Sequence, residues 1–193
     1  MRALDEHLLR LARTRGHTPG AERSVAGFSR LGEHGAVWLA LGAAGWALDR
    51  PRRARWARAS GVVAATYALN TALKLLVRRP RPQLPGLPAL TSTPTRLSFP
   101  SAHASTSFAG ARAYSRLGLP AGPLYALAAG LACSRIYLGV HYPSDLVAGA
   151  LLGTAVAACG CGGRAAAGHG GPAPTCRGRG TSTRGRSPMP TPS

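Results

Sequence analysis

The chain has 193 residues, the length of one domain with or without tails, and its formal net charge is +18. Such a charge on a soluble protein points first to nucleic acid, but 45% of these residues are hydrophobic and lie in long blocks. The blocks favour a membrane protein over a nucleic-acid-binding one, and basic residues between them then act as topology signals and contacts to anionic headgroups.

Residues 1–30 form a basic leader. Leu4, Leu8 and Leu11 fall on one helical face, with arginines elsewhere on the helix, which predicts a short interfacial helix. A disordered cationic leader is the alternative. Asp5 and its neighbours interrupt any apolar core of the kind that a signal peptide needs.

Five apolar blocks follow, and they predict an all-α, polytopic membrane helix bundle of about five spans within residues 31–159. Trp38 and Trp46 are expected to mark the membrane interfaces of the first block. The blocks are residues 35–48 (entered from Leu31), 59–77, 100–117, 119–134 and 145–159.

Small residues predict how two of these blocks pack. The third block is rich in Ser, Ala and Gly and carries Arg112 and Arg116, so it belongs inside the bundle rather than against lipid. In the fifth block, Gly149 and Gly153 have the spacing of a close helix–helix contact.

The connecting segments are polar. Residues 50–58 are expected to form a loop with five arginines, and the Pro/Thr/Ser-rich residues 83–99 are expected to lie over the membrane surface. Residues 160–193 lack periodicity and are rich in Gly, Arg and Pro, which predicts a disordered basic tail.

A polar stretch between the last two blocks carries the first sign of chemistry. Asp145 is the only carboxylate after Asp49, and it follows His141 by four residues and Arg135 by ten. A carboxylate can hold the proton on one imidazole nitrogen and leave the other free to attack, while an arginine can bind an anion. The alternative is a short loop in which His141 and Asp145 merely cap a helix.

Lys74 is the single lysine of a chain that otherwise uses arginine. It lies near the end of an apolar block, where a charge costs about 2.5–3.5 kcal/mol. An anion-binding ammonium and a snorkelling anchor both account for it.

Helical hairpins bring the polar residues together. Counting crossings places the ends of the second and fourth blocks and the beginnings of the third and fifth on one side of the membrane. Cations, imidazoles and one carboxylate beside helix N-termini make a phosphate site. The converging residues are Lys74, Arg81, Ser101, His103, Arg135, His141 and Asp145.

Three motifs on this side resemble the signatures of the type-2 phosphatidate phosphatase superfamily, which includes lipid phosphate phosphatases, undecaprenyl-diphosphate phosphatases and haloperoxidases. Ala102 stands where the family usually has glycine, and we expect this methyl group to be tolerated. Arg81, and not Arg79, has the family spacing from Lys74, so Arg79 is left as an anion-steering or solvated charge. The motifs are Lys74-x6-Arg81-Pro82, Pro100-Ser101-Ala102-His103 and Ser134-Arg135-x5-His141-x3-Asp145.

The resemblance implies a mechanism without a metal ion or other cofactor. His141, held by Asp145, would attack phosphorus and form a phosphohistidine, and His103 would protonate the leaving group and then activate water. The other histidines, His34 among them, are expected at the surface or in the tail. The residues implied to bind the substrate phosphate are Lys74, Arg81, Ser101, Ala102 and Arg135.

A phosphate site in a membrane bundle predicts a lipid phosphate substrate and no nucleic-acid partner. The chain resembles actinobacterial members of the superfamily that are linked to decaprenyl-phosphoryl-phosphoribose, with undecaprenyl diphosphate and phosphatidate-type lipids as alternatives. A non-catalytic lipid-binding or transporter-like bundle is the rival class. The arginines of residues 50–58, with Arg112 and Arg116, favour the cytoplasm for the opposite side, so the site is expected on the extracytoplasmic face of the cell membrane.

Overall fold

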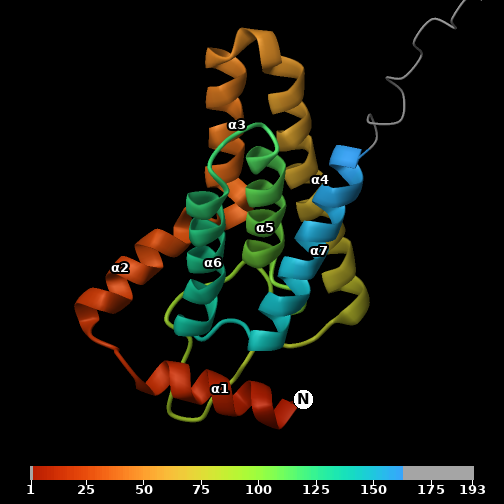
Figure 1. Ribbon diagram of the computed structural model, residues 1–193. Helices are drawn as coiled ribbons and strands as arrows, with labels where there is room; N and C mark the ends of the chain where they lie inside the picture. Colours follow the sequence, from red (N-terminus) through yellow and green to blue (C-terminus); the bar gives the residue numbers. More distant parts are fainter. Residues whose placement is uncertain (1, 163–193) are drawn as a thin grey trace, which may run out of the picture. The chain divides into compact units, whose positions relative to one another are not determined.

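The computed structural model describes residues 2–162, and within that range the chain is helical, with two isolated β-bridges and no strand (Figure 1). The prediction of an all-α fold is confirmed. Most of the predicted tail, residues 163–193, lies outside the described residues. The helices are α1 (Arg2–Thr14), α2 (Pro19–Arg30), η1 (Glu33–Gly35), α3 (Ala36–Leu48), η2 (Arg50–Arg52), α4 (Arg53–Val77), α5 (Ala102–Ser115), α6 (Ala121–Tyr137) and α7 (Pro143–Gly162).

Helix α5 is the centre of the bundle and packs against α4, α6 and α7 (Figure 1). Its small residues are buried along its length, as predicted for the third block. A Cβ atom added at Gly153 of α7 would lie 2.0 Å from the carbonyl oxygen of Ser105, and one at Gly149 would lie 2.6 Å from that of Ser101. The predicted close contact of these glycines is therefore confirmed, because any side chain would push α7 away from α5.

Two expectations about the first hairpin are wrong. Residues 50–58 are not a loop, since α4 begins at Arg53 after the short turn η2. Pro51 is tolerated in a first turn and arginine is a good helix former, so the helix extends toward its N-terminus. Trp38 does not mark an interface: it is fully buried, and its indole N–H donates to Ser107 Oγ over 3.1 Å.

Two of the described helical segments are long and apolar enough to cross a membrane: Arg50–Val77, which joins η2 to α4, and Pro143–Gly160 of α7. Helices α3, α5 and α6 have 13, 14 and 17 residues. At about 1.5 Å per residue they are roughly 20–26 Å long, less than the hydrocarbon thickness of about 30 Å. The number of spans therefore stays a prediction.

The leader is not disordered, because α1 and α2 account for most of it. Helix α1 buries Asp5, Leu9 and Arg13, which follow one another at four-residue intervals, whereas Leu4 and the other predicted leucines are exposed. Helix α2 was not predicted; Thr18 caps it by accepting the N–H of Ala21. Both helices contact α6, so residues before 31 pack against the bundle.

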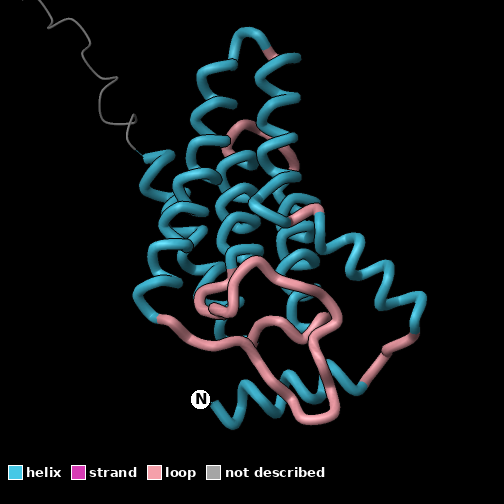
Figure 2. Tube along the Cα trace, turned by 180° about the vertical axis from the view of Figure 1, so that it is seen from behind, coloured by secondary structure: helices cyan, strands magenta, loops and turns pink. Residues whose placement is uncertain are grey.

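A long loop joins α4 to α5 without regular structure, as expected for a Pro-rich segment. Figure 2 shows it folded across the end of the bundle near α1. Arg78 ends α4 in a left-handed conformation with φ 52°, and its N–H donates to Lys74 O. The loop returns to Ser101, the N-cap of α5.

Candidate active site

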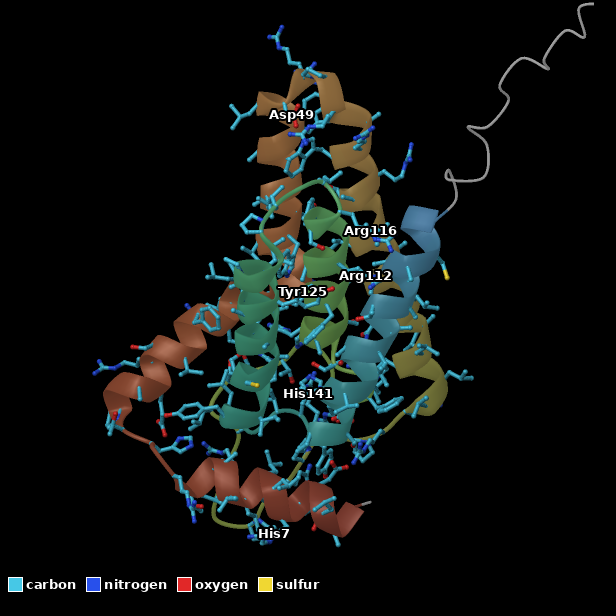
Figure 3. All side chains as sticks on the ribbon, in the orientation of Figure 1. His7, Asp49, Arg112, Arg116, Tyr125 and His141 are labelled. Atoms are coloured by element: carbon cyan, nitrogen blue, oxygen red, sulfur yellow. The ribbon has the colours of Figure 1, made fainter. Side chains whose placement is uncertain are left out.

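A pocket of about 430 Å³ opens at the end of the bundle where α4 and α6 finish and α5 and α7 begin. Figure 3 shows His141 at this end and Asp49, Arg112 and Arg116 toward the opposite end. Polar residues from distant parts of the chain therefore share one cavity. Six of the residues predicted for the site line it: Lys74, Arg81, Ala102, His103, Arg135 and His141.

The hydrogen bonds of His141 define its tautomer. Arg81 Nη1 lies 3.1 Å from Nε2 and can only donate, so Nε2 carries the lone pair. Nδ1 then carries the proton and faces Asp145 Oδ2 at 3.5 Å. Burial lowers the pKa of His141 to about 3, and Arg81 and Lys74 act in the same direction while Asp145 opposes them. The ring is therefore neutral at physiological pH, with its free electron pair beside a pocket-lining guanidinium.

Asp145 is fully buried, and both of its oxygens are held. Oδ2 accepts from the backbone N–H of Tyr142 over 2.9 Å and from the Ser98 hydroxyl. Oδ1 accepts from Arg79 Nη1 over 2.8 Å. Asp145 thus caps the first turn of α7 and faces His141 at the same time. A helix-capping role and a role in orienting the imidazole are therefore compatible.

Three cations surround the pocket. Lys74 Nζ donates to the carbonyl oxygens of Leu97 and Ser98 over 3.3 and 3.1 Å. Arg81 Nη1 also donates to Val140 O over 2.7 Å. Burial lowers the pKa of Arg81 to about 10, which still leaves it charged at neutral pH. Neutral carbonyls hold these cations without cancelling their charge, which favours an anionic ligand.

Arg135 and His103 share a partner that the sequence did not reveal. Arg135 Nη1 donates to Ser29 Oγ over 2.8 Å, and His103 Nε2 donates to Ser29 O over 2.9 Å. Arg135 Nε is buried without a partner. Ser29 belongs to α2, so a residue of the leader fixes two pocket-lining side chains.

Ser101 lies at the site but does not line the pocket. It is fully buried, and its N–H donates to Asp145 O over 3.0 Å, which ties the start of α5 to α7. Its hydroxyl is buried without a hydrogen-bond partner. Ala102, the next residue, lines the pocket in the place where the family pattern has glycine.

The mouth of the pocket is polar and was not predicted. His34 Nδ1 and Tyr67 Oη lie 2.7 Å apart, at hydrogen-bond distance, and both line the mouth with Glu33 and Thr71. His34 is exposed, as expected, and has a φ of 52°. Two residues of the long loop, Ser92 and Thr95, add further polar groups. In the sequence, the only indication of a special conformation at Glu33-His34 is the pair of glycines that flank them.

Comparison with known proteins agrees with the motifs. A family model described as the PAP2 superfamily matches residues 55–161. A protein of Mycobacterium tuberculosis named decaprenylphosphoryl-5-phosphoribose phosphatase is 44% identical over 142 residues, which cover 72% of this chain and 78% of the relative. A protein of the same name from Mycolicibacterium smegmatis is 40% identical over 132 residues, covering 68% and 72%.

Two crystal structures have the same fold. LpxE of Aquifex aeolicus superposes with a TM-score of 0.71 and 27% identity, over 82% of this chain and 95% of that one. A transmembrane PAP2-type phosphatidylglycerolphosphate phosphatase from Bacillus subtilis gives a TM-score of 0.66 and 23% identity, over 83% and 84%. The resemblance found in the motifs is therefore confirmed, and the chain belongs to the PAP2 superfamily.

Proposed function

We propose that this protein is an integral membrane phosphatase that hydrolyses the phosphate ester of a polyprenyl-type lipid through a phosphohistidine. The observation that carries the proposal is the neutral His141, with Nδ1 facing Asp145 and Nε2 facing the cation-lined pocket. A transporter-like bundle has no need for this arrangement.

In the first step, Nε2 of His141 attacks phosphorus and the bond from phosphorus to the ester oxygen breaks. The protonated form of His103 gives its proton to the leaving oxygen. Asp145 stabilises the positive charge that develops on the His141 ring, because it faces the Nδ1 proton. In the second step, His103 takes a proton from water as the water attacks the phosphohistidine, which releases inorganic phosphate.

The cations stabilise the transferring phosphoryl group. Lys74, Arg81 and Arg135 would contact its equatorial oxygens, where charge accumulates in the transition state. The free backbone N–H groups in the first turn of α5, which begins at Ala102, add the partial positive charge of a helix N-terminus to that of the cations. These fixed charges take the place that a metal ion has in other phosphatases.

For the substrate we propose a polyprenyl-linked phosphoribose that carries a 5-phosphate, as in the names of the mycobacterial relatives. The polar mouth supports this choice, because Glu33, Tyr67 and Thr71 offer hydrogen bonds that suit sugar hydroxyls and not acyl chains. The cationic floor would then hold the 5-phosphate while the mouth holds the ribose.

For the membrane arrangement we propose five crossings, α3 to α7, with the site on the extracytoplasmic side. The support is the similarity to a transmembrane phosphatase and the arginines at the opposite end of the bundle. Exposed Leu4, Leu8 and Leu11 would place α1 in the membrane interface. A topology reporter fused at Cys159 should report the cytoplasm, and a periplasmic signal would reverse the orientation.

The activity is tested with purified protein in detergent and an added chelator. We expect phosphate release from decaprenylphosphoryl-5-phosphoribose to be faster than from undecaprenyl diphosphate or phosphatidate, and the chelator to have no effect. Tyr67→Phe should raise KM for the phosphoribose lipid and leave KM for phosphatidate unchanged. Absence of phosphate release from every lipid, or loss of activity with the chelator, would contradict the proposal.

A further inference from the structure

Behind Asp145, on the side away from His141, lies a second charged pair that the motifs do not include. Arg79 bridges two carboxylates: Nη1 donates to Asp145 Oδ1 over 2.8 Å, and Nη2 donates to Asp5 Oδ2 over 2.8 Å. The Asp5 and Asp145 side chains are 8% and 0% exposed. Asp5 belongs to α1, so the first helix of the chain reaches the carboxylate that orients His141.

Asp5 also holds the first turn of α7 directly. Its Oδ1 accepts from the Ser144 N–H over 3.0 Å, and its Oδ2 accepts from the Ser144 hydroxyl over 2.6 Å. Arg79 donates to the same hydroxyl over 2.7 Å and lies 4.1 Å above the ring of Tyr142. The residues on both sides of Pro143 are therefore fixed by one acid and one base from outside α7.

The other end of α1 is anchored as well. Arg13 is buried and donates to Pro88 O over 2.7 Å and to Tyr137 O over 3.3 Å. Asp5 and Arg13 thus dock one face of α1 on the segments that lead into and out of the site. Burying these two charges is unfavourable unless hydrogen bonds offset it. The hydrogen bonds that do so join α1 to segments beside the site.

We propose that Asp5 and Arg79 are positioning residues for phosphoryl transfer, which set the Asp145 carboxylate against His141. The proposal rests on the proposed function of the same site. Neither residue lines the active-site pocket, so both act through Asp145.

The physical reason is the balance of charge around Asp145. Arg79 fixes Oδ1, and the Ser98 hydroxyl and a backbone N–H fix Oδ2, which faces His141. A lone guanidinium would also withdraw the negative charge that the imidazolium needs. Asp5 offsets the charge of Arg79, so Asp145 is oriented and stays available to the ring. Since Oδ2 lies 3.5 Å from Nδ1, longer than a good hydrogen bond, a small rotation of the carboxylate decides whether the contact tightens when charge develops.

The test uses Asp5→Asn and Arg79→Gln in the full chain, with Glu6→Gln and Arg78→Gln as controls. Each control removes the same charge from the adjacent, exposed residue. We expect kcat to fall about 10- to 100-fold in both test variants, as for a misplaced catalytic group, and KM to change less than about twofold. The controls should match the unmodified protein.

The double variant distinguishes a positioning role from a structural one. If Asp5 acts through Arg79, Asp5→Asn combined with Arg79→Gln should lose no more kcat than Arg79→Gln alone, and Arg79→Lys should recover part of the loss. Three results would overturn the inference. The first is a double variant whose loss of kcat is the product of the two single losses, and the second is a rise in KM in place of the fall in kcat. The third is a fall in kcat that matches the unfolded fraction in a thermal melt. An inactive unmodified protein would instead overturn the proposed function.

Discussion

The two ends of α5 lie in opposite environments. At its start, His103 lines a pocket together with three cations, and buried polar atoms at this end, among them Arg135 Nε and Ser101 Oγ, have no partner. At its end, Tyr114 stacks on Trp38 at 6.4 Å, donates to Trp38 O over 2.8 Å and contacts Ser60 Oγ at 3.1 Å. Arg112 Nε, near the aromatic end, is also without a partner, so the two ends differ in what surrounds them: cations and imidazoles at the first and aromatic packing at the second. The first end suits an anionic ligand, and the second holds the bundle together.

This division teaches that activity and stability can be separated along one helix. Buried charges are unfavourable unless a partner offsets them, so a cluster of cations around a pocket is expected where an anionic substrate completes it. The aromatic end supplies the burial that offsets this loss. Four variants or conditions test the separation, from the largest expected effect to the smallest.

His141→Ala should abolish turnover and leave the fold intact. Loss of a nucleophile lowers kcat by about 10⁴-fold or more, equivalent to roughly 5.5 kcal/mol. Phosphate release in detergent measures it, and His7→Ala, an exposed histidine on α1 (Figure 3), is the matched control. Residual activity above a few per cent in purified His141→Ala would remove this residue as the nucleophile.

Trp38→Ala should destabilise the fold and leave the active site of the folded molecules unchanged. Removing a fully buried indole at the aromatic end is expected to destabilise the protein by about 3–5 kcal/mol. The fraction that remains folded should keep the KM of the unmodified protein, because Trp38 does not line the pocket. Trp46→Ala, at a partly exposed tryptophan of the same helix, should have a much smaller effect on the melting temperature.

Arg135→Lys keeps the charge and removes the planar guanidinium that Ser29 holds. Because lysine cannot make paired hydrogen bonds to a phosphoryl group, kcat/KM should fall about 10- to 100-fold. Steady-state kinetics check this, with Arg15→Lys on the exposed part of the leader as a control. Equal kcat/KM values for the variant and the unmodified protein would show that charge alone suffices at this position.

Acid should lower the free energy of unfolding, and this effect should be the smallest of the four. Burial lowers the pKa of His141 to about 3, below its unfolded value of about 6.5. The unfolded chain therefore binds a proton between these values that the folded chain does not, so stability falls as pH falls below about 6.5 and is unaffected above it. From pH 7 to pH 6 the loss should be roughly 0.7 kcal/mol.

Melting curves of the unmodified protein and of His141→Gln check this dependence. The variant has no imidazole to protonate at this position, so its melting temperature should vary less with pH across the same interval. Parallel pH dependences for the two proteins would mean that His141 is not the group that titrates.

The structure also shows which parts of the fold the sequence could predict. The long apolar blocks, bounded by Pro and Arg, predicted the limits of α4 to α7 to within a few residues at most ends. Small residues predicted the central position of α5 and the close packing at Gly153. The exception at Arg53 arises because an arginine-rich segment suits a helix end as well as a loop. Six of the residues named from the motifs line the pocket, whereas Ser101 does not. The roles assigned to these residues stay predictions.

Residue type, order and spacing determined the family, the candidate chemistry and the helical class of this protein, because these depend on local pattern and on a few side chains at fixed intervals. Only the tertiary structure decided that α1 buries Asp5, Leu9 and Arg13 in place of the three predicted leucines, and that Ser29 and Arg79 support the site. Asp5 and Arg79 are 74 positions apart. No periodicity within either segment encodes a contact across that distance, since it depends on how the whole bundle packs.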